Sequence, residues 1–396
     1  MDELEIGWLM PGGRAGGRTG EGRIVDLDAG LPGDRVQWKR TGQRGNVLVG
    51  HTEAVRVPSP DRRAPPCPWS TRCGGCDLAD LTPGARRDAL AAMVQRVFGA
   101  QTRPPVFASP RETGHRARIK LAISGDKLGY RAARSHEIVE VDGCLAARPE
   151  VDAEIAAVRG LLAEIGSTGL TAVELRSDGA RVVRSFLSDG PVSPSVRAGL
   201  ARAGDTALDG RTLSGDAALS IPVGARHRRA SPLSFYQVNL EVNAALVAFA
   251  AEVILARGPE RVLDLYAGIG NLGLPIAEAG VPVVAVEAEG QATADLRHNA
   301  TGLPVTVIEA RLPAWDPSRT AFDALVLDPP RAGAPGMLRR LLAQRPRVVV
   351  YVACDPGTGA RDVREALAAG YRLTDLRCFD LFPDTHHLET VAVLER

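Results

Sequence analysis

Two polar motifs follow apolar runs in this 396-residue sequence, and their residue types could do chemistry. Cys354 follows Val348–Ala353 and precedes Asp355-Pro356. An unbroken apolar run is typical of a buried parallel strand, and ligands of α/β proteins bind at the carboxyl ends of such strands. A cysteine in a strand is more often structural, but its place at this edge predicts that Cys354 is a nucleophile. Cys378 has no comparable context, so we expect it to be structural.

The second motif, Asp328-Pro329-Pro330-Arg331, follows the apolar run Ala324–Leu327. The two prolines restrict the chain and can shape a slot for a flat base. Enzymes that methylate amino groups use a similar motif, but with an aromatic residue where this chain has Arg331. Glu389, just before the last expected strand, is a candidate base, although a surface acid is the simpler interpretation of this residue taken alone.

A glycine-rich motif joins an expected strand to an expected helix. Gly268, Gly270 and Gly273 form G-x-G-x-x-G after the strand, and Glu287 ends the next strand. This arrangement fits a dinucleotide, and a nicotinamide-dependent oxidoreductase is therefore one alternative. It fits S-adenosylmethionine equally well, with the second-strand acid on the ribose. Asp264 favours S-adenosylmethionine, because a carboxylate suits ammonium and sulfonium groups and repels a pyrophosphate.

Four further cysteines have spacings typical of metal ligands. Cys67, Cys73 and Cys76 are separated by five and two residues, and Cys144 lies further along the chain. Two thiolates two residues apart can hold one metal, and the intervening Gly74-Gly75 lets the backbone wrap closely. Four cysteines fit a [4Fe–4S] cluster or a structural zinc ion. The spacing favours iron–sulfur only modestly, because a zinc ribbon would have two Cys-x2-Cys pairs.

The elements that must position these groups fall into three parts. Residues 1–57 are rich in glycine and predict a small barrel, with β-like pieces between turn signals. Residues 58–230 begin with a proline-rich joint and predict a mixed α+β part. Residues 231–396 alternate strands and helices, which predicts a doubly wound, mostly parallel sheet. A helix at about 79–99 could pack on this last part.

The individual elements follow from apolar periodicity and turn signals. In the first two parts we expect strands at 23–27, 35–39, 46–50, 119–123 and 138–141, a helix at 151–165, and a hairpin of 172–175 with 181–186. In the last part we expect strands at 261–266, 281–287, 305–308, 324–328, 347–353 and 390–395, and helices at 239–256, 271–279, 290–300, 337–343 and 360–369.

The charge of the chain is balanced as a whole and uneven locally. Lys+Arg number 48 and Asp+Glu 47, a net charge of +1, so the protein is not basic all over. Residues 103–134 carry eight basic and two acidic side chains. This run suits a phosphate backbone, or equally a solvated face balanced by acids from elsewhere. Arg226–Arg229 is a second basic run.

The sequence has no targeting or membrane signal that we recognise. The acidic start, Met1–Glu5, lacks the cationic flank and apolar run of a signal peptide. The apolar stretch 246–256 is interrupted by Glu252 and is too short to cross a bilayer. We therefore expect a soluble cytoplasmic protein with no membrane partner.

Taken together, the motifs resemble the RNA 5-methyluridine methyltransferase family over nearly the whole chain. Residues 17–57 look like a TRAM domain, an OB-like RNA-binding barrel, notably at Gly20–Gly22 and Leu31–Asp34. The four-cysteine pattern is similar to the family's [4Fe–4S] site, which raises iron–sulfur well above zinc. Other matching stretches are His115–Lys120, Leu128–Arg131, Ser135-His136 and Phe235–Asn239.

The resemblance implies a fold and a set of site residues. It implies a TRAM-like barrel at 1–57, a central α+β iron–sulfur domain at 58–230, and a Rossmann-like class I methyltransferase domain at 231–396. It assigns Cys354 as nucleophile, Glu389 as general base and Asp328 to the active site. The implied S-adenosylmethionine contacts are Gln237, Tyr266, Gly268, Gly270, Glu287 and Asp328, and the implied cluster ligands are Cys67, Cys73, Cys76 and Cys144.

The implied activity is methylation of uridine C5 in structured RNA by a monomeric enzyme. The barrel and cluster together favour 23S rRNA, with tRNA as the alternative, since archaeal-type tRNA enzymes share both features. An RNA-binding module without catalysis is a further alternative. Because uracil C5 is a weak nucleophile, addition of a thiolate to C6 must precede methyl transfer, and a base must then remove the C5 proton. Phe107, Tyr236 and Tyr266 are candidates to stack on the uracil.

The sequence departs from the family pattern beside the nucleophile. The family usually has Asn after the cysteine, and this chain has Asp355. A carboxylate directed at Cys354 would disfavour the thiolate and slow the reaction. A carboxylate that caps the following turn would leave the thiol unaffected.

Overall fold

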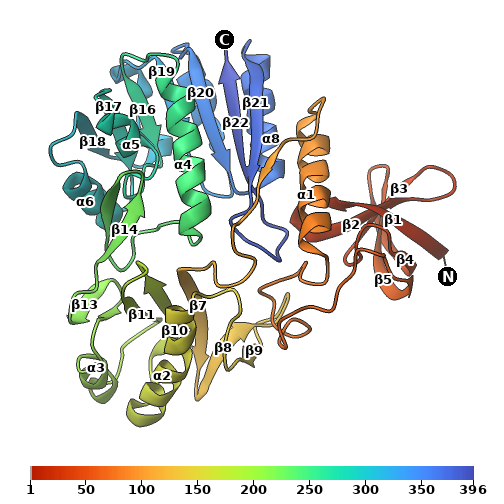
Figure 1. The fold of residues 1–396 in the computed structure, drawn as a ribbon, viewed down its shortest axis with the longest axis horizontal. Helices are drawn as coiled ribbons and strands as arrows, with labels where there is room; N and C mark the ends of the chain where they lie inside the picture. The colour runs from red at the N-terminus through yellow and green to blue at the C-terminus, as the bar shows by residue number, and fades with distance from the viewer. Residues whose placement is uncertain (1) are drawn as a thin grey trace.

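The computed structural model describes residues 2–396, which form three lobes (Figure 1). The N-terminal lobe is a closed barrel, the central lobe contains a seven-stranded sheet, and the C-terminal lobe is built on an eight-stranded sheet. Helix α1 (Pro83–Phe98) stands between the barrel and the eight-stranded sheet.

The barrel closes in the strand order β1-β2-β3-β5-β4 around an apolar interior that includes Ile6, Val25 and Trp38. Two of its strands, β1 and β2, were not expected from the sequence. A bulge between Ile6 and Trp8 breaks the two-residue alternation by which β1 would be recognised. The strands are β1 (Asp2–Met10), β2 (Arg14–Arg18), β3 (Ile24–Leu27), β4 (Arg35–Arg44) and β5 (Val47–Val57), with a 3-10 turn, η1 (Pro11–Gly13).

The central sheet has the order β13-β12-β11-β10-β7-β8-β9, and α2 packs on β10 and β11. The expected hairpin is confirmed, since β10 and β11 pair antiparallel. Val151, Ile155 and Val158 of α2 lie in the core of this lobe. The elements are β7 (Arg118–Ser124), β8 (Lys127–Arg131), β9 (Ile138–Glu140), α2 (Pro149–Ile165), β10 (Leu170–Ser177), β11 (Val182–Ser188), α3 (Pro194–Leu200), β12 (Thr206–Leu208) and β13 (Arg211–Ser214).

The C-terminal sheet has the order β18-β17-β16-β19-β20-β22-β21-β6, and the run from β18 to β20 is parallel, as expected. Its strands are β16 (Val262–Leu265), β17 (Val283–Glu287), β18 (Val305–Glu309), β19 (Ala324–Leu327), β20 (Val348–Ala353), β21 (Arg372–Phe379), β22 (Glu389–Glu395) and β6 (Val106–Phe107). Its helices are α4 (Leu240–Leu255), α5 (Gly273–Glu278), α6 (Gly290–Asn299), α7 (Met337–Leu342) and α8 (Pro356–Ala368), with 3-10 turns η2 (Leu312–Ala314) and η3 (Pro317–Arg319).

Two strands of this sheet were not expected. In strand β21 the adjacent polar residues Thr374 and Asp375 break the alternation, at an irregularity in the pairing with β22, so the strand lacks a clear period. Strand β6 is two residues long and pairs with β21 from a distant part of the chain. Helix α8 also begins earlier than expected, at Pro356.

Elements from before residue 231 pack on the C-terminal lobe. Helix α1 contacts both β1 of the barrel and α8. Its buried Arg86 forms an ion pair with the buried Asp380, at 2.7 Å. The ribbon β14 (Leu219–Val223) and β15 (Arg226–Ala230) pairs antiparallel, with β14 against α4 and β15 against α6.

Among the helices of residues 2–396, none combines the length and the apolar character that crossing a membrane requires.

Candidate functional site

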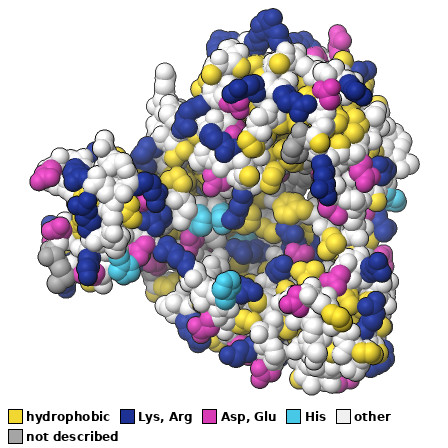
Figure 2. Space-filling view, turned by 180° about the vertical axis from the view of Figure 1, so that it is seen from behind, with side chains coloured by type: hydrophobic (Ala, Val, Ile, Leu, Met, Phe, Trp, Pro, Cys, Tyr) yellow, Lys and Arg dark blue, Asp and Glu magenta, His cyan; other side chains and the backbone are white. Residues whose placement is uncertain are grey.

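The parallel strands of the C-terminal lobe end at one edge of the sheet, and the predicted reactive residues follow these ends. Tyr266 follows β16, Glu287 ends β17, Asp328 follows β19 and Cys354 follows β20. Carboxyl ends of parallel strands meet at the same edge, so these residues lie along one edge of the sheet. On the face drawn in Figure 2, the surface is hollowed between the lobes, and arginine or lysine, histidine and hydrophobic side chains gather there.

The glycine loop after β16 is held by Glu287. The N–H of Gly268 donates to Glu287 Oε2 at 2.8 Å, while Oε1 accepts from the backbone of Ala288 and Glu289. Tyr266 has a φ of +60°, a left-handed conformation that costs energy for a residue other than glycine. These hydrogen bonds and this backbone conformation give the loop a defined shape.

The two expected cofactor glycines have different surroundings. A Cβ atom at Gly268 would have nothing within 4 Å, so this residue faces open space. A Cβ atom at Gly270 would lie 2.2 Å from Leu274, so this residue faces the packed interior. Only Gly268 can therefore let a ligand approach the backbone, whereas Gly270 permits close packing of α5.

Asp264 lies beneath this loop and is fully enclosed. Its Oδ2 accepts a hydrogen bond from the N–H of Gly273 at 2.9 Å, at the start of α5. Burial, with further contributions from the Asp328 and Glu287 charges, raises its pKa to about 8. Asp264 thus fixes the start of the helix, a role that the sequence analysis did not anticipate.

Cys354, Asp328 and Glu389 are brought together by the sheet. Strand β22 runs antiparallel to β20, and Thr390 pairs with Ala353, which sets Glu389 beside Cys354. Glu389 is 2% exposed, and its Oε1 has no hydrogen-bond partner. An orphaned buried carboxylate oxygen is costly in an isolated fold and is typical of a site awaiting a ligand.

The three groups are close enough to shift one another's pKa. Burial raises the pKa of Cys354 to about 12, with the Glu389 and Asp328 charges adding to the rise. Burial raises the pKa of Asp328 to about 6, and burial together with Asp328 raises the pKa of Glu389 well above its usual value. Arg331 opposes these shifts at both Cys354 and Glu389.

Asp362 ties the Asp328–Arg331 loop to the strand that precedes Cys354. Its buried carboxylate accepts from the N–H of Ala334 at 2.9 Å and from the Tyr351 hydroxyl at 2.5 Å. Tyr351 belongs to β20, so one carboxylate links the loop that carries Arg331 to the strand that carries the thiol.

The carboxylate of Asp355 is directed away from the thiol. Asp355 is the N-cap of α8, and its Oδ1 accepts from the N–H of Thr358 at 2.7 Å. The charges that shift the Cys354 pKa come from Glu389, Asp328 and Arg331. The alternative in which Asp355 caps the following turn is therefore confirmed.

The segment Phe235–Gln237 lies where the central lobe meets the C-terminal lobe. Gln237 is 6% exposed, and the Tyr236 hydroxyl donates to backbone carbonyls of Ala117 and Ser177. Tyr236 is thus packed between lobes and unavailable for stacking, contrary to its inclusion among the candidates. Phe235 is 53% exposed, and the Arg118 guanidinium lies 4.6 Å from the centre of its ring.

The stacking candidates change accordingly. Phe107 is exposed, but it lies on β6, the outermost strand of the sheet, against Phe379. Phe235 was not among the candidates, but its ring is exposed whereas the next two residues, Tyr236 and Gln237, are buried.

Buried polar groups fix this segment from both sides. Arg176 of β10 donates to the carbonyls of Ser231 and Ser234, at 2.8 and 2.5 Å. Asp295 of α6 accepts from the Ser231 backbone and from both serine hydroxyls. The chain just before Phe235 is therefore anchored to β10 of the central sheet and to α6 at once.

The two basic runs differ in how many of their side chains are exposed and free to contact a phosphate backbone. In residues 103–134, Arg103, Lys120 and Lys127 are exposed, whereas Arg118 pairs with Glu174 at 3.2 Å. In the run 226–229, Arg228 is 2% exposed and pairs with Glu278, so it supports the fold.

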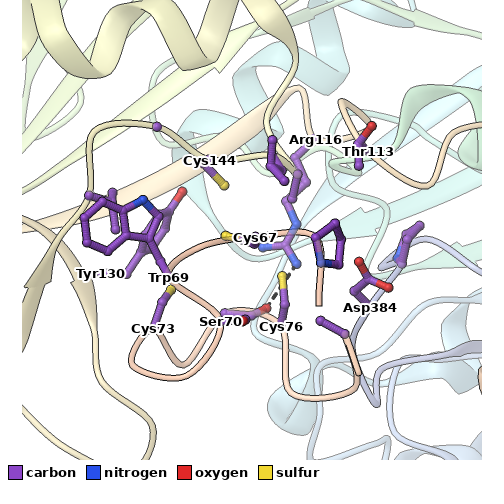
Figure 3. A pocket seen from close by; sticks show the side chains of 18 of the residues that line it. Cys67, Trp69, Ser70, Cys73, Cys76, Thr113, Arg116, Tyr130, Cys144 and Asp384 are labelled. Atoms are coloured by element: carbon purple, nitrogen blue, oxygen red, sulfur yellow. Dashed lines mark hydrogen bonds between the residues drawn. The ribbon is translucent and has the colours of Figure 1, made fainter. Parts of the chain in front are cut away.

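Cys67, Cys73, Cys76 and Cys144 line one pocket, together with Trp69, Arg116 and Tyr130 (Figure 3). All four are free thiols. Burial raises the pKa of Cys76 to about 12 and also raises that of Cys73, and in both cases neighbouring cysteines add to the rise while Arg116 opposes it. Within residues 2–396, no three His, Cys, Asp or Glu side chains converge tightly enough to hold a metal ion.

The side chains of this pocket fit a metal centre bound by thiolates, whose overall charge is negative. Arg116 lines it, and its Nε is buried without a hydrogen-bond partner. Four thiols compressed into one pocket need a cationic centre to become thiolates, and a nearby guanidinium then balances their excess negative charge.

The chain resembles known proteins over its length. Residues 306–396 match the family model described as tRNA (Uracil-5-)-methyltransferase. The chain is 32% identical to the 23S rRNA (uracil(1939)-C(5))-methyltransferase RlmD of Shewanella sp. (strain MR-7), over 95% of this chain and 91% of the relative. It is 31% identical to the RlmD protein of Chromohalobacter salexigens, over 100% and 89% respectively.

A solved structure shares the fold. The tRNA (uracil-54, C5)-methyltransferase of Pyrococcus abyssi, in complex with S-adenosyl-L-homocysteine, superposes with a TM-score of 0.79. The two chains are 24% identical, and the match covers 99% of each.

Proposed function

Since the chain belongs to the RNA uracil-C5-methyltransferase family, we propose that it methylates C5 of a uridine in 23S rRNA, with S-adenosylmethionine as methyl donor. The observation that carries the proposal is the convergence of Cys354, Asp328 and Glu389 at the edge of the sheet where the parallel strands end. A nicotinamide-dependent oxidoreductase has no use for this thiol, and family membership removes that alternative together with the non-catalytic RNA-binding module.

The cofactor site that we propose is built from the loop and strand ends. S-adenosylmethionine supplies an electrophilic methyl group when it is bound. Gly268 faces open space and lets the ligand approach the backbone, and Glu287 combines its loop contacts with acceptance from the ribose hydroxyls. Gly270 acts indirectly, by permitting the packing on which the loop rests. Gln237, Tyr266 and Asp328 complete the set.

Cys354 begins the reaction by adding to uracil C6. The thiolate forms the S–C6 bond, and the displaced electron pair makes C5 nucleophilic. C5 then takes the methyl group, and the donor leaves with its sulfur neutral. Glu389 removes the C5 proton, and the resulting electron pair expels the thiolate from C6. The enzyme is restored when Glu389 releases this proton to water.

The electrostatics of the cleft suit these roles. Glu389 has a raised pKa and is therefore a stronger base than an exposed carboxylate once it has lost its proton. Arg331 lowers the pKa of Cys354 and so favours the attacking thiolate, whereas Glu389 and Asp328 raise this pKa.

We further propose that Phe235 stacks on the uridine that leaves the RNA helix. Its ring is exposed, and the Arg118 guanidinium lies against it. An aromatic platform beside a cation suits a flipped base and its phosphate. The barrel of residues 1–57 and the exposed Lys120 and Lys127 are proposed RNA contacts of a monomeric cytoplasmic enzyme.

The cysteine pocket is proposed to hold a [4Fe–4S] cluster through Cys67, Cys73, Cys76 and Cys144. Four cysteines that line one pocket can hold one centre, and this shared pocket supports the proposal. Arg116 also lines this pocket, and its buried Nε, which has no hydrogen-bond partner, fits the negative charge of a thiolate-bound cluster. The domain boundaries near residues 57 and 230 also stay a proposal.

Mass spectrometry of RNA from a deletion strain tests the substrate. We expect one 5-methyluridine to disappear from 23S rRNA and to return when the wild-type protein is supplied, but not when Cys354→Ala is supplied. Loss of 5-methyluridine from tRNA with unchanged 23S rRNA would move the proposal to its second candidate, a tRNA target.

A covalent adduct tests the chemistry. Glu389→Ala can add to uracil and accept the methyl group but cannot lose the C5 proton, so it should accumulate an RNA–protein adduct stable to denaturation. Cys354→Ala should form none and should lose at least about 1,000-fold in rate. Normal turnover by Glu389→Ala would contradict the role given to this residue.

A further inference from the structure

The loop that leads to Glu389 is bonded to the loop that carries the cysteines. Asp77, next to Cys76, accepts from the backbone N–H of His386 at 3.0 Å and contacts its ring Nδ1 at 2.5 Å. The N–H of Leu78 donates to the Asp384 carbonyl at 3.0 Å. These hydrogen bonds join two segments that lie about three hundred residues apart in the sequence.

The barrel closes on the same pair. Gly13, in the turn η1 between β1 and β2, has a φ of +72°. A Cβ atom at Gly13 would lie 2.8 Å from Asp77 Oδ2 and 3.0 Å from His386 Cβ. Real side chains do not approach so closely, and only glycine therefore lets the barrel seat against Asp77 and His386.

A short chain of contacts leads from this junction to the reacting groups. The rings of His386 and His387 lie 4.0 Å apart between centroids. Arg331 Nη2 lies 3.2 Å from His387 Nε2, and burial, with the neighbouring His386 and Arg331, lowers the His387 pKa to about 4. A neutral His387 can accept a hydrogen bond from Arg331. The charge of Arg331 lowers the pKa of both Cys354 and Glu389 and so favours their ionised forms.

We propose that Asp77 is a positioning residue for the methylation proposed above, because it holds Arg331 at the reacting groups through His386 and His387. The barrel contacts Asp77 and His386 at Gly13 and so supports their arrangement. The inference rests on the proposed function. If Asp77 has this role, the packing of the barrel against Asp77 and the fold of the cysteine loop affect the rate of the chemical step, in addition to any effect on RNA binding.

Two neighbouring glycines provide a matched test. Gly12 and Gly13 have φ values of +77° and +72°, so alanine strains the backbone about equally at both positions. Only Gly13 faces Asp77 and His386, because a Cβ atom at Gly12 would have nothing within 4 Å. Gly13→Ala should lower kcat for RNA methylation on the order of 10-fold to 100-fold, with a smaller change in KM. Gly12→Ala should keep the wild-type kcat.

Asp77 itself gives a second test, with rescue by a conservative variant. Asparagine can accept from the His386 N–H and donate to its ring, whereas alanine can do neither. Asp77→Ala should therefore have a lower kcat and form the covalent adduct more slowly than the wild type. Asp77→Asn should restore most of both rates. Amide hydrogen exchange should accelerate across residues 380–389 in Asp77→Ala and Gly13→Ala, and stay unchanged in Gly12→Ala. Metal content should be equal in all variants.

The outcomes separate this inference from the proposed function. If the wild-type protein makes no 5-methyluridine, the proposed function fails. If the wild type is active and Gly13→Ala and Asp77→Ala match it in kcat, the positioning role of Asp77 is wrong. Equal losses in Gly12→Ala and Gly13→Ala would also overturn it, because backbone strain alone would then explain them.

Discussion

Cys354 lies in surroundings that oppose its ionisation. Burial, Glu389 and Asp328 all raise its pKa, to about 12, and Arg331 is the neighbouring cation that lowers it. The thiol is therefore almost fully protonated near neutral pH before RNA binds. Such a thiol resists oxidation and stray alkylation, since only the thiolate is strongly nucleophilic.

Alkylation of Cys354 by a neutral reagent should report this pKa. The rate should rise about tenfold per pH unit through the neutral and alkaline range, because the thiolate fraction rises by that factor well below the pKa. Arg331→Met should slow the reaction at every pH, since it removes the charge that favours the thiolate. Peptide mass spectrometry distinguishes Cys354 from the other five cysteines. A plateau near pH 8 would contradict the described environment.

At the scale of an element, the start of α8 explains why Asp355 is tolerated beside a nucleophile. Its carboxylate accepts from Thr358 at the first turn, so its charge serves the helix. Asparagine and aspartate are comparable N-caps, so the Asn expected from the family resemblance and the Asp355 of this chain satisfy the same structural need.

Substitutions at Asp355 should separate capping from catalysis. Asp355→Asn should keep both the free energy of unfolding and kcat within small limits, because asparagine caps equally well. Asp355→Ala should lower the free energy of unfolding by about 1 kcal/mol, measured by chemical denaturation. A large rise in kcat for Asp355→Asn would mean that the carboxylate does act on the thiol.

The helix α1 is a second case in which an element serves a distant part of the chain. Arg86 is 0% exposed and pairs with the buried Asp380, just before the loop that holds His386. The helix thereby ties the cysteine-bearing segment to the C-terminal sheet. A buried ion pair of this kind specifies where two elements meet, even when it adds little to net stability.

At the scale of the whole molecule, the lobes meet around the hollow face seen in Figure 2. The cysteine pocket lies where distant segments converge, since it is lined by residues near 67–76, 112–116, 141–146 and 383–384. A metal centre there would fasten the cysteine loop to the central lobe. The near-neutral net charge of the chain is compatible with RNA binding, because exposed cations such as Lys120 and Lys127 are concentrated in the stretch 103–134.

Anaerobic purification should therefore yield about four iron atoms per chain. Cys144→Ala should lose iron and lower Tm, because it releases one ligand and loosens the pocket. Cys354→Ala, a cysteine outside the pocket, should keep its iron and serves as the control. A preparation that holds zinc and no iron would refute the cluster.

The sequence by itself determined which residues stand at the ends of the parallel strands. Tyr266, Glu287, Asp328 and Cys354 follow apolar runs, and parallel strand ends must share an edge, so their meeting could be predicted without coordinates. The tertiary structure decided the rest. Glu389 reaches Cys354 because β22 runs antiparallel beside β20, a pairing that no local pattern encodes.

Side-chain direction was likewise decided only by packing. Phe235 is exposed and Tyr236 buried because the lobes close on one of two adjacent aromatic residues. Strands β1, β6 and β21 escaped prediction because a bulge, a two-residue length and mixed polarity hide their period. The junction of Gly13, Asp77 and His386 joins three distant segments, and local periodicity carries no information about such contacts, because they depend on how completed elements pack.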